Sequence, residues 1–283
     1  MRLGYNTNGL AHHRLVDAID LLADEGYESV AITLDAGALD PYDDAGRLEQ
    51  ESIRVGEILE RRGMSCVIET GARFVLNPRL KHDPTLMDAD PARRAVRVDF
   101  LRRAIDLAAR LRADAMSFWS GGLGDAISEE QALDRLVGAL QPVIEHAERR
   151  DVRLAFEPEP GMFIDTFERF SRLDERVRHP LFDLTVDVGH VFCVEPGSTA
   201  ERIAPWVSRI ANVHIEDMHR NLHEHLMFGE GSMDFPPILE TLFRGGYRGG
   251  VHVELSRHSH MAVDAVRRSR DFLRAIWPEG ALV

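Results

Sequence analysis

Four short apolar stretches in the second half of the chain each carry, at or near the end, a side chain that can bind a metal. The residues are Glu157 in "VRLAFE", Asp187 in "FDLTVD", His214 in "NVHIE" and Glu254 in "VHVEL". One such residue alone is typical of a turn or a helix cap. Four together are hard to explain structurally, because buried carboxylates without a cation repel one another and destabilise the fold. This oxygen and nitrogen set suits Mn²⁺, Co²⁺, Zn²⁺ or Mg²⁺ better than a metal that prefers thiolates, so we predict a divalent-metal site.

These stretches belong to a regular alternation of β-like and helical patterns. Short runs rich in branched residues predict strands at 2–6, 29–34, 65–70, 115–120, 152–158, 182–187, 210–216 and 250–255. An amphipathic helical pattern follows each run, most clearly after Ser128, which is a candidate N-cap. Eight such units predict the α/β class and a (β/α)8 TIM barrel that residues 1–283 form as a single domain. A doubly wound open sheet is the alternative, but it would bring fewer strands to a single mouth.

The longest interruption of this alternation lies between the third strand and its helix. Residues 71–94 read "GARFVLNPRLKHDPTLMDADPARR", and their prolines and polar residues predict a loop with little regular structure. A long loop at the C-terminal end of a barrel strand is more often functional than not, so we take it as a candidate lid. Its Arg73, Arg79, Lys81 and His82 are candidates for binding an anionic substrate group, and a solvated loop is the simpler interpretation.

Composition narrows the class of partner. Acidic residues outnumber basic ones by 47 to 34, a net charge of −13, and such a surface repels phosphate backbones and anionic membranes. We therefore expect no nucleic acid and no membrane as partners. No apolar run approaches the ~18 residues of a membrane span, and the N-terminus has no signal-peptide pattern. The two cysteines form no disulfide framework, so we expect a cytoplasmic protein.

Longer motifs in the second half of the chain resemble a known superfamily. They are "FEPEPG", "VDVGH", "NVHIEDMHR", "HEHLMFGEGSMDF" and "GYRGGVHVEL". The chain resembles the xylose-isomerase-like TIM barrels of the sugar phosphate isomerase/epimerase type. Their relatives include ketose 3-epimerases, inosose dehydratases and type IV AP endonucleases. The resemblance covers nearly the whole chain and implies the same barrel fold, a carbohydrate substrate and, often in this superfamily, a homo-oligomer.

The resemblance also implies roles for individual residues. The superfamily's four metal ligands match Glu157, Asp187, His214 and Glu254. His190 matches a substrate-contacting histidine of the epimerases and a metal ligand of the endonucleases, and Arg220 matches a substrate-binding arginine of the epimerases. His223 and His225 lie where the endonucleases hold an additional metal with a His/Asp pair. These two histidines are therefore candidates for an additional metal or for substrate.

The residue types suit proton transfer next to a carbonyl group. A divalent metal, most simply Mn²⁺, stabilises the enediolate as a Lewis acid, while Glu157 and Glu254 are the predicted catalytic acid and base. Glu159 points the same way as Glu157 by strand alternation and could contact substrate. Trp119 ends the fourth strand, where it could stack on a sugar or serve as a large core residue. We therefore predict a metal-dependent sugar isomerase or epimerase.

Two departures from the relatives leave other reactions open. Phe163 stands where the ketose 3-epimerases carry another carboxylate, which argues against a strict ketose 3-epimerase. The ends of the third and fourth strands lack the histidines that the endonucleases need, so an AP-endonuclease-like phosphodiesterase ranks third. A lyase or dehydratase acting on an inosose or a 3-keto glycoside is the second choice, because it shares the enolisation step. The non-enzyme alternative is a metabolite-binding barrel.

Overall fold

The barrel expected from the sequence is the fold of the protein. The computed structural model describes residues 1–71 and 73–280, and it contains a closed barrel of eight parallel strands in the order β1-β10-β7-β6-β5-β4-β3-β2. The strands are β1 (Arg2–Asn6), β2 (Ser29–Thr33), β3 (Ser65–Glu69), β4 (Met116–Phe118), β5 (Leu154–Phe156), β6 (Phe182–Asp187), β7 (Ile210–Ile215) and β10 (Gly250–Val253). Each overlaps its predicted range. The barrel closes through parallel pairing of β1 with β10, which rules out the open sheet.

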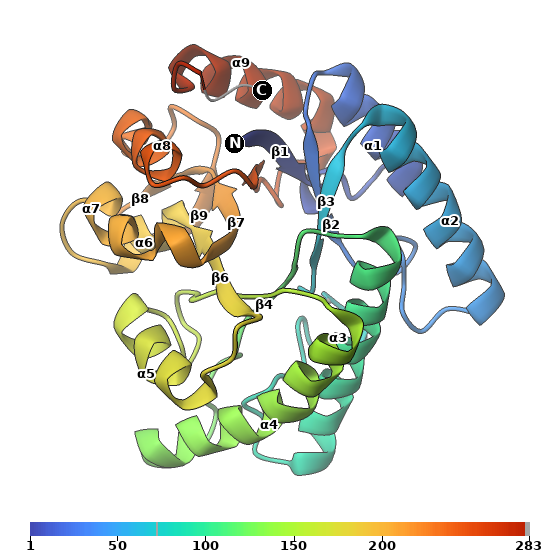
Figure 1. Cartoon of the computed structure of the whole chain (residues 1–283), viewed down its shortest axis with the longest axis vertical. Helices are drawn as coiled ribbons and strands as arrows, with labels where there is room; N and C mark the ends of the chain where they lie inside the picture. Colours follow the sequence, from blue (N-terminus) through green and yellow to red (C-terminus); the bar gives the residue numbers. More distant parts are fainter. Residues whose placement is uncertain (72, 281–283) are drawn as a thin grey trace.

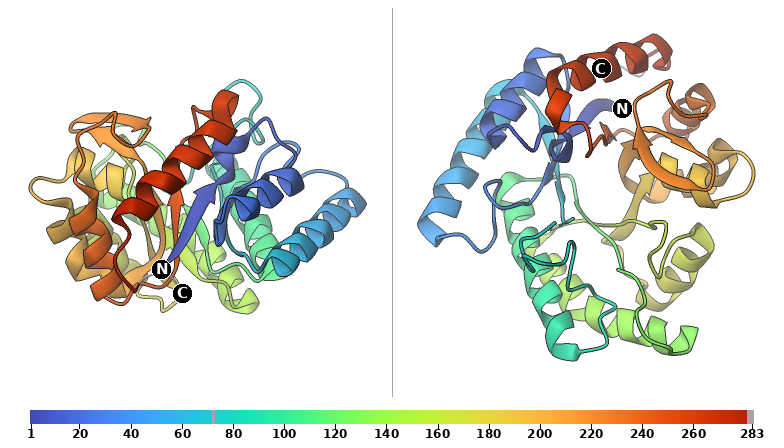
Figure 2. Two further views of the ribbon diagram at one scale, coloured as in Figure 1. Left: turned by 90° about the horizontal axis from the view of Figure 1, so that it is seen from above. Right: turned by 180° about the vertical axis from the view of Figure 1, so that it is seen from behind.

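Helices surround the barrel (Figure 1). They are α1 (Leu15–Asp24), α2 (Ala45–Arg62), α3 (Pro91–Leu111), α4 (Glu129–Arg150), α5 (Phe167–Val177), α6 (Val188–Val194), α7 (Thr199–Ile203), α8 (Phe235–Arg244) and α9 (Ala262–Ile276), with short 3-10 helices at Thr7–Leu10, Ala204–Arg209 and Ser259–Met261. Ser128 caps α4 as predicted, in a capping box with Gln131. The views in Figure 2 show α9 beside β1, where the last unit meets the first. None of the described helices is long and apolar enough to cross a membrane.

One element departs from the expected strand–helix alternation. The chain leaves β7 through an antiparallel hairpin, β8 (Asp217–His219) and β9 (Leu222–Leu226), before α8 begins. The carboxylate of Asp217 holds the segment that follows, because it accepts hydrogen bonds from the backbone N–H groups of Gly229 and Gly231 at 2.9 and 3.0 Å. The helical pattern expected after the seventh strand is therefore present only after this hairpin.

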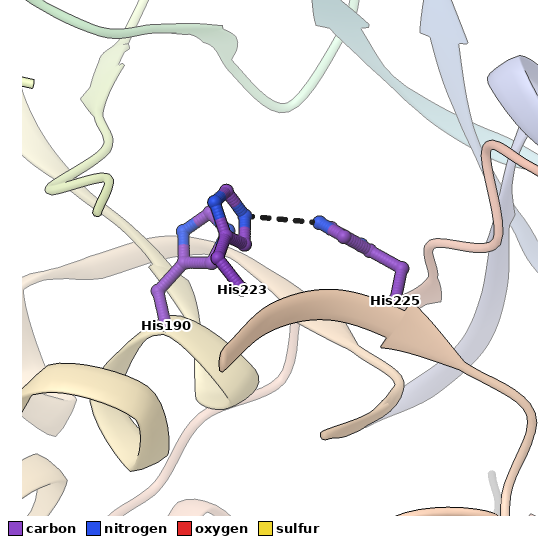
Figure 3. A group of neighbouring side chains, drawn as sticks. All are labelled: His190, His223 and His225. Atoms are coloured by element: carbon purple, nitrogen blue, oxygen red, sulfur yellow. Dashed lines mark hydrogen bonds between the residues drawn. The ribbon is translucent and has the colours of Figure 1, made fainter. Parts of the chain in front are cut away.

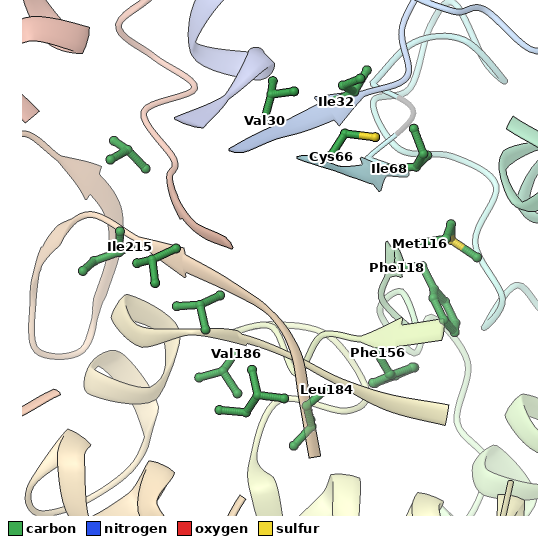
Figure 4. Close-up of a cluster of buried hydrophobic side chains, with 14 of the residues drawn as sticks. Val30, Ile32, Cys66, Ile68, Met116, Phe118, Phe156, Leu184, Val186 and Ile215 are labelled. Carbon is green, nitrogen blue, oxygen red and sulfur yellow. The ribbon is translucent and has the colours of Figure 1, made fainter. Parts of the chain in front are cut away.

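The apolar core lies between the strands and the helices. Val30, Ile68, Phe156, Val186 and Ile215 belong to this core, and all of them are nearly inaccessible to solvent (Figure 4). Successive side chains of a strand point to opposite faces of the sheet, so the residues that alternate with these core residues face the barrel interior. That interior is unusually polar, and its side chains hydrogen-bond to one another. In one example, the His252 ring lies 2.8 Å from both Asn212 Oδ1 and Ser29 Oγ. The same alternation that builds the core therefore points polar groups inward.

The predicted loop after the third strand lacks helix and strand in the described residues between β3 and α3. It is nevertheless tied down by the buried Arg97 of α3. The Arg97 guanidinium donates to the backbone carbonyls of Thr70, His82 and Pro84 at 3.1, 2.7 and 2.9 Å. These bonds hold the loop against the barrel mouth, and its movement as a lid stays a prediction.

Candidate functional site

A cavity opens at the C-terminal ends of the barrel strands. Its volume of 210 Å³ restricts the ligand to a small molecule or to one unit of a larger one. Eight of the predicted site residues line it: Trp119, Glu157, Glu159, His190, His214, His223, His225 and Glu254. They come from β4, β5, α6, β7, β9, β10 and the segments that directly follow these elements, and barrel closure brings them together.

The four predicted metal ligands converge at the base of this cavity, where Glu157, His214 and Glu254 line it and Asp187 lies next to them. Glu157, Asp187, His214 and Glu254 each offer one ligand atom, and these atoms all lie within 4.8 Å of one another. The His214 Nδ1 atom lies 3.1 Å from Glu157 Oε1 and 3.0 Å from Glu254 Oε2. The imidazole is therefore bracketed by carboxylates from two strands on either side of it in the barrel.

Burial makes the charges of this group interdependent. Desolvation raises the pKa of Glu157 to about 8, against the attraction of His214. Burial also opposes ionisation of Glu254, but the neighbouring His214 holds the pKa of Glu254 well below its usual range. Burial likewise disfavours the charged form of His214, yet the carboxylates of Glu69, Glu254 and Glu157 raise its pKa well above the usual value. The proton affinities of these three groups are therefore set by burial and by one another.

Several buried polar atoms at this site lack a hydrogen-bond partner within residues 1–71 and 73–280. They are Asp187 Oδ2, both ring nitrogens of His190 and both carboxylate oxygens of Glu216. Burial and the nearby Asp187 carboxylate raise the pKa of Glu216 well above its usual value. Buried polar groups are normally hydrogen-bonded. Oxygen and nitrogen atoms that lack a partner, as these do, are suited to binding a cation.

Glu216 was missed by the sequence reasoning. It directly follows β7 and offers a ligand atom in a second group with Asp187, His225 and Glu254. A carboxylate two residues after His214 was a signal that strand alternation could have supplied. Gly189 makes room for it, because a Cβ atom at Gly189 would overlap a Glu216 carboxylate oxygen. The close approach of the Glu216 carboxylate therefore explains why a glycine stands at position 189 of the "VDVGH" motif.

A cluster of three histidines lies beside the four ligands (Figure 3). The ring of His190 in α6 is centred 4.6 Å from that of His223 and 5.7 Å from that of His225, both in β9. His223 and His225 approach each other with their Nε2 atoms 3.3 Å apart. Burial lowers the pKa of His190 to about 3, and it also lowers the pKa of His223. Burial thus favours the neutral form of His190 and His223, which is the form of histidine that binds metals.

Glu69 was also missed. It ends β3, where the sequence was searched for histidine only, and its Oε1 atom lies 2.9 Å from the Nε2 atom of His214. Asn212 donates from Nδ2 to the same Glu69 oxygen at 2.9 Å. A carboxylate that accepts the far N–H of an imidazole fixes the orientation of the ring. In the neutral form that binds a metal, this would leave Nδ1, the nitrogen that faces Glu157 and Glu254, as the ligand atom. The rule that found Glu157, a carboxylate at a strand end, applies equally to Glu69.

Among the described residues, Arg220 is the one predicted site residue that neither lines the cavity nor belongs to the group of four ligands or the histidine cluster. Its exposed guanidinium donates to the backbone carbonyls of Glu195 and Gly197 at 2.8 and 3.0 Å, and it stacks over the Phe192 ring at 4.4 Å. Arg220 does not line the cavity in the described structure, so contact with a substrate there would require it to leave these partners.

Most of the remaining candidate residues line the cavity. Trp119 is a cavity wall that meets the His82 ring edge-on at 5.6 Å. The loop residues Arg73, Lys81 and His82 line the cavity as well, together with Arg257 from beyond β10. Arg79 is exposed and lies outside the cavity lining that the described residues form.

Comparison with known proteins agrees with the fold. The family described as "Xylose isomerase-like TIM barrel" matches residues 19–276. L-ribulose-5-phosphate 3-epimerase UlaE of Escherichia coli is 23% identical over 222 residues, which cover 78% of this chain and 78% of that protein.

Two solved structures share the fold. D-allulose 3-epimerase from Methylomonas sp., in complex with D-allulose, superposes with a TM-score of 0.75 and 18% identity over 98% of this chain and 97% of that chain. The IOLI protein with a bound zinc atom superposes with a TM-score of 0.77 and 17% identity over 98% of each chain. These identities show a common barrel, and the chemistry must be argued from the residues.

Proposed function

Because the chain belongs to the xylose isomerase-like TIM barrel family, we propose that it is a metal-dependent isomerase or epimerase acting on a sugar or sugar-like polyol. One observation carries the proposal: Glu157 and Glu254 approach the same nitrogen of one buried imidazole, with His214 Nδ1 3.1 Å from Glu157 Oε1 and 3.0 Å from Glu254 Oε2. The named relatives, an L-ribulose-5-phosphate 3-epimerase and a D-allulose 3-epimerase, act in the same class and support it.

The two carboxylates would move the proton. In a substrate seated in the cavity, one of them removes the proton from the carbon next to the carbonyl group, and the other returns one to the neighbouring position or to the opposite face. Asn8 orients Glu254, because Asn8 Nδ2 donates to Glu254 Oε1 at 2.7 Å. His190, Glu159 and Trp119 also line the cavity, where they would hold hydroxyl groups and the apolar face of the sugar.

The donor set also suits the proposed cofactor. Glu157, Asp187, His214 and Glu254 would hold one divalent cation, Mn²⁺ being the first choice and Co²⁺, Zn²⁺ or Mg²⁺ the others. The cation would supply Lewis-acid stabilisation of the oxyanion that forms when the proton leaves. His190, His223 and His225 would hold a second cation or contact the substrate, since each offers one ligand nitrogen within the same 4.8 Å limit. Cytoplasmic location and homo-oligomerisation stay predictions.

Removal of Glu69 is expected to weaken metal binding. In Glu69→Ala the far nitrogen of His214 loses its carboxylate, and loss of such a partner typically costs ~10–100-fold in metal affinity. Competition with a chelating dye measures the affinity, and thermal unfolding of the metal-free protein checks the fold. Glu159→Gln is the matched control, because Glu159 lines the same cavity without a hydrogen bond to His214 among the described contacts. Equal affinity in wild type and Glu69→Ala would refute this role.

The reaction class can be tested by solvent exchange. The metal-loaded protein is incubated in D₂O with ketopentoses, ketohexoses, their phosphate esters and an inosose, and products are analysed by NMR and mass spectrometry. We expect about one deuterium at the carbon next to the carbonyl group and an isomeric product of otherwise unchanged mass. Loss of water or of an aglycone would instead identify the lyase. Cleavage of an abasic duplex would identify the phosphodiesterase, and binding without any exchange would leave a metabolite-binding barrel.

A further inference from the structure

Positive side chains gather at the rim of the cavity whose base is acidic. Arg73 and Lys81 come from the loop after β3, and Arg257 comes from the segment after β10. All three line the same cavity as Glu157 and Glu254. In a protein with a net charge of −13, three cations at the opening of a cavity with an acidic base call for an explanation.

Described protein groups satisfy only part of the hydrogen-bonding capacity of these three cationic side chains. Lys81 has no hydrogen bond and no ion pair within 4.0 Å in the part of the chain that the structure describes. Arg257 makes one exposed contact, from Nη1 to Glu224 Oε1 at 3.3 Å. Arg73 donates from Nη2 to the Asn8 carbonyl at 2.8 Å, and its Nη1 lies 3.3 Å from Asp35 Oδ2.

Neutralisation of the acidic base does not account for this arrangement. If the rim cations served to offset the carboxylates, they would pair with them. Among the described residues, neither Lys81 nor Arg257 forms an ion pair with Glu157, Glu159 or Glu254. Glu157 and Glu254 contact His214 instead, and Lys81 acts on Glu159 only without direct contact, by lowering its pKa against the larger effect of burial. The charged ends of Lys81 and Arg257 are therefore available to a group that enters from outside.

The rim is also held in position. Arg97 fastens the loop through the carbonyl groups of Thr70, His82 and Pro84, so Lys81 is attached to a restrained segment. The neighbouring His82 ring contacts the Gly71 carbonyl, and burial lowers its pKa to about 4. His82 thus adds a neutral ring beside Lys81 and no further charge.

We infer that the substrate carries an anionic group, a phosphate ester or a carboxylate, which Arg73, Lys81 and Arg257 bind at the rim while its sugar part reaches the base of the cavity. The inference rests on the proposed function, since it names the substrate class of that site. It also explains how a strongly acidic protein would admit an anionic substrate, because the three cations would offset the repulsion where the anion binds.

Kinetics on matched substrates test the inference. A ketopentose, its 5-phosphate and the corresponding sugar acid are compared with wild type, Lys81→Met, Arg257→Met and the control Arg79→Met, whose arginine lies on the same loop but outside the cavity lining. We expect wild type to prefer an anionic member by kcat/KM. Lys81→Met should raise KM for that member about tenfold with little change in kcat, and leave KM for the free sugar unchanged. Preference for the phosphate or for the acid identifies the anion.

A binding measurement separates this inference from the proposed reaction. Inorganic phosphate and malonate are titrated into the metal-loaded wild type and the same variants by calorimetry, with no turnover required. Weaker binding in Lys81→Met and Arg257→Met than in Arg79→Met supports the rim site even if no sugar is converted. Equal binding by all four proteins, or equal kcat/KM for free and anionic sugars, would overturn the inference while leaving the isomerase proposal intact.

Discussion

Glu157→Gln and Glu254→Gln are each expected to lower kcat by about 10²–10⁴-fold, the usual contribution of a positioned acid or base. Glutamine keeps the size of the side chain but neither takes up nor releases a proton. Because glutamine has nearly the shape of glutamate, it should fill the buried position of Glu157 and leave the packing intact. Steady-state kinetics on the best substrate measures the effect, and circular dichroism checks the fold.

Metal loss must be separated from loss of the acid or base in these variants. Metal content is therefore measured on each variant after loading, and kcat is compared only between samples of equal occupancy. Glu168→Gln, an exposed carboxylate in the first turn of α5, is the control and should behave as wild type. Full activity in loaded Glu157→Gln or Glu254→Gln would exclude that residue as acid or base.

Asp187→Ala is expected to lose the metal that wild type retains. Elemental mass spectrometry should find about one equivalent of manganese, cobalt or zinc in wild type and almost none in the variant, because Asp187 Oδ2 is buried and has no partner among the described residues. A metal at 100 times its Kd would stabilise the folded state by ~2.7 kcal/mol. Added metal should therefore raise the Tm of wild type and leave that of the variant unchanged.

Asp187 has a second role that the experiment must separate. Its Oδ1 atom caps α6 by accepting the backbone N–H of His190 at 2.9 Å, and loss of such a cap costs ~1 kcal/mol without any metal. Asp187→Asn keeps an oxygen for the cap but removes the charge, so it should be more stable than Asp187→Ala and still bind metal poorly. Two or three zinc ions in wild type would bring His190, His223 and His225 into the ligand set. Metal retained equally by both variants would refute Asp187 as a ligand.

The sequence alone determined the barrel and most of the candidate site. Parallel strands all end at one rim, so a residue's place at the end of an apolar run is enough to assign it to that rim. This rule found Glu157, Asp187, His214 and Glu254, which the structure brings within 4.8 Å of one another. The same rule was applied too narrowly to two strands. At the end of the third strand only histidines were sought, which overlooked Glu69, and on the seventh strand only His214 was assigned, which overlooked Glu216.

Only the tertiary structure decided which polar side chains meet. Whether Glu69 reaches His214 depends on the stagger between strands that are far apart in sequence, and local pattern carries no information on that stagger. The hairpin that presents His223 and His225 also broke the expected alternation. Irregular segments follow no period: Lys81 faces the cavity whereas Arg79 does not, and Arg220 turns to backbone carbonyls. The alternation of apolar and polar residues is enough to locate the strands in the sequence. The conformations of the loops depend instead on long-range contacts, such as those that Arg97 makes.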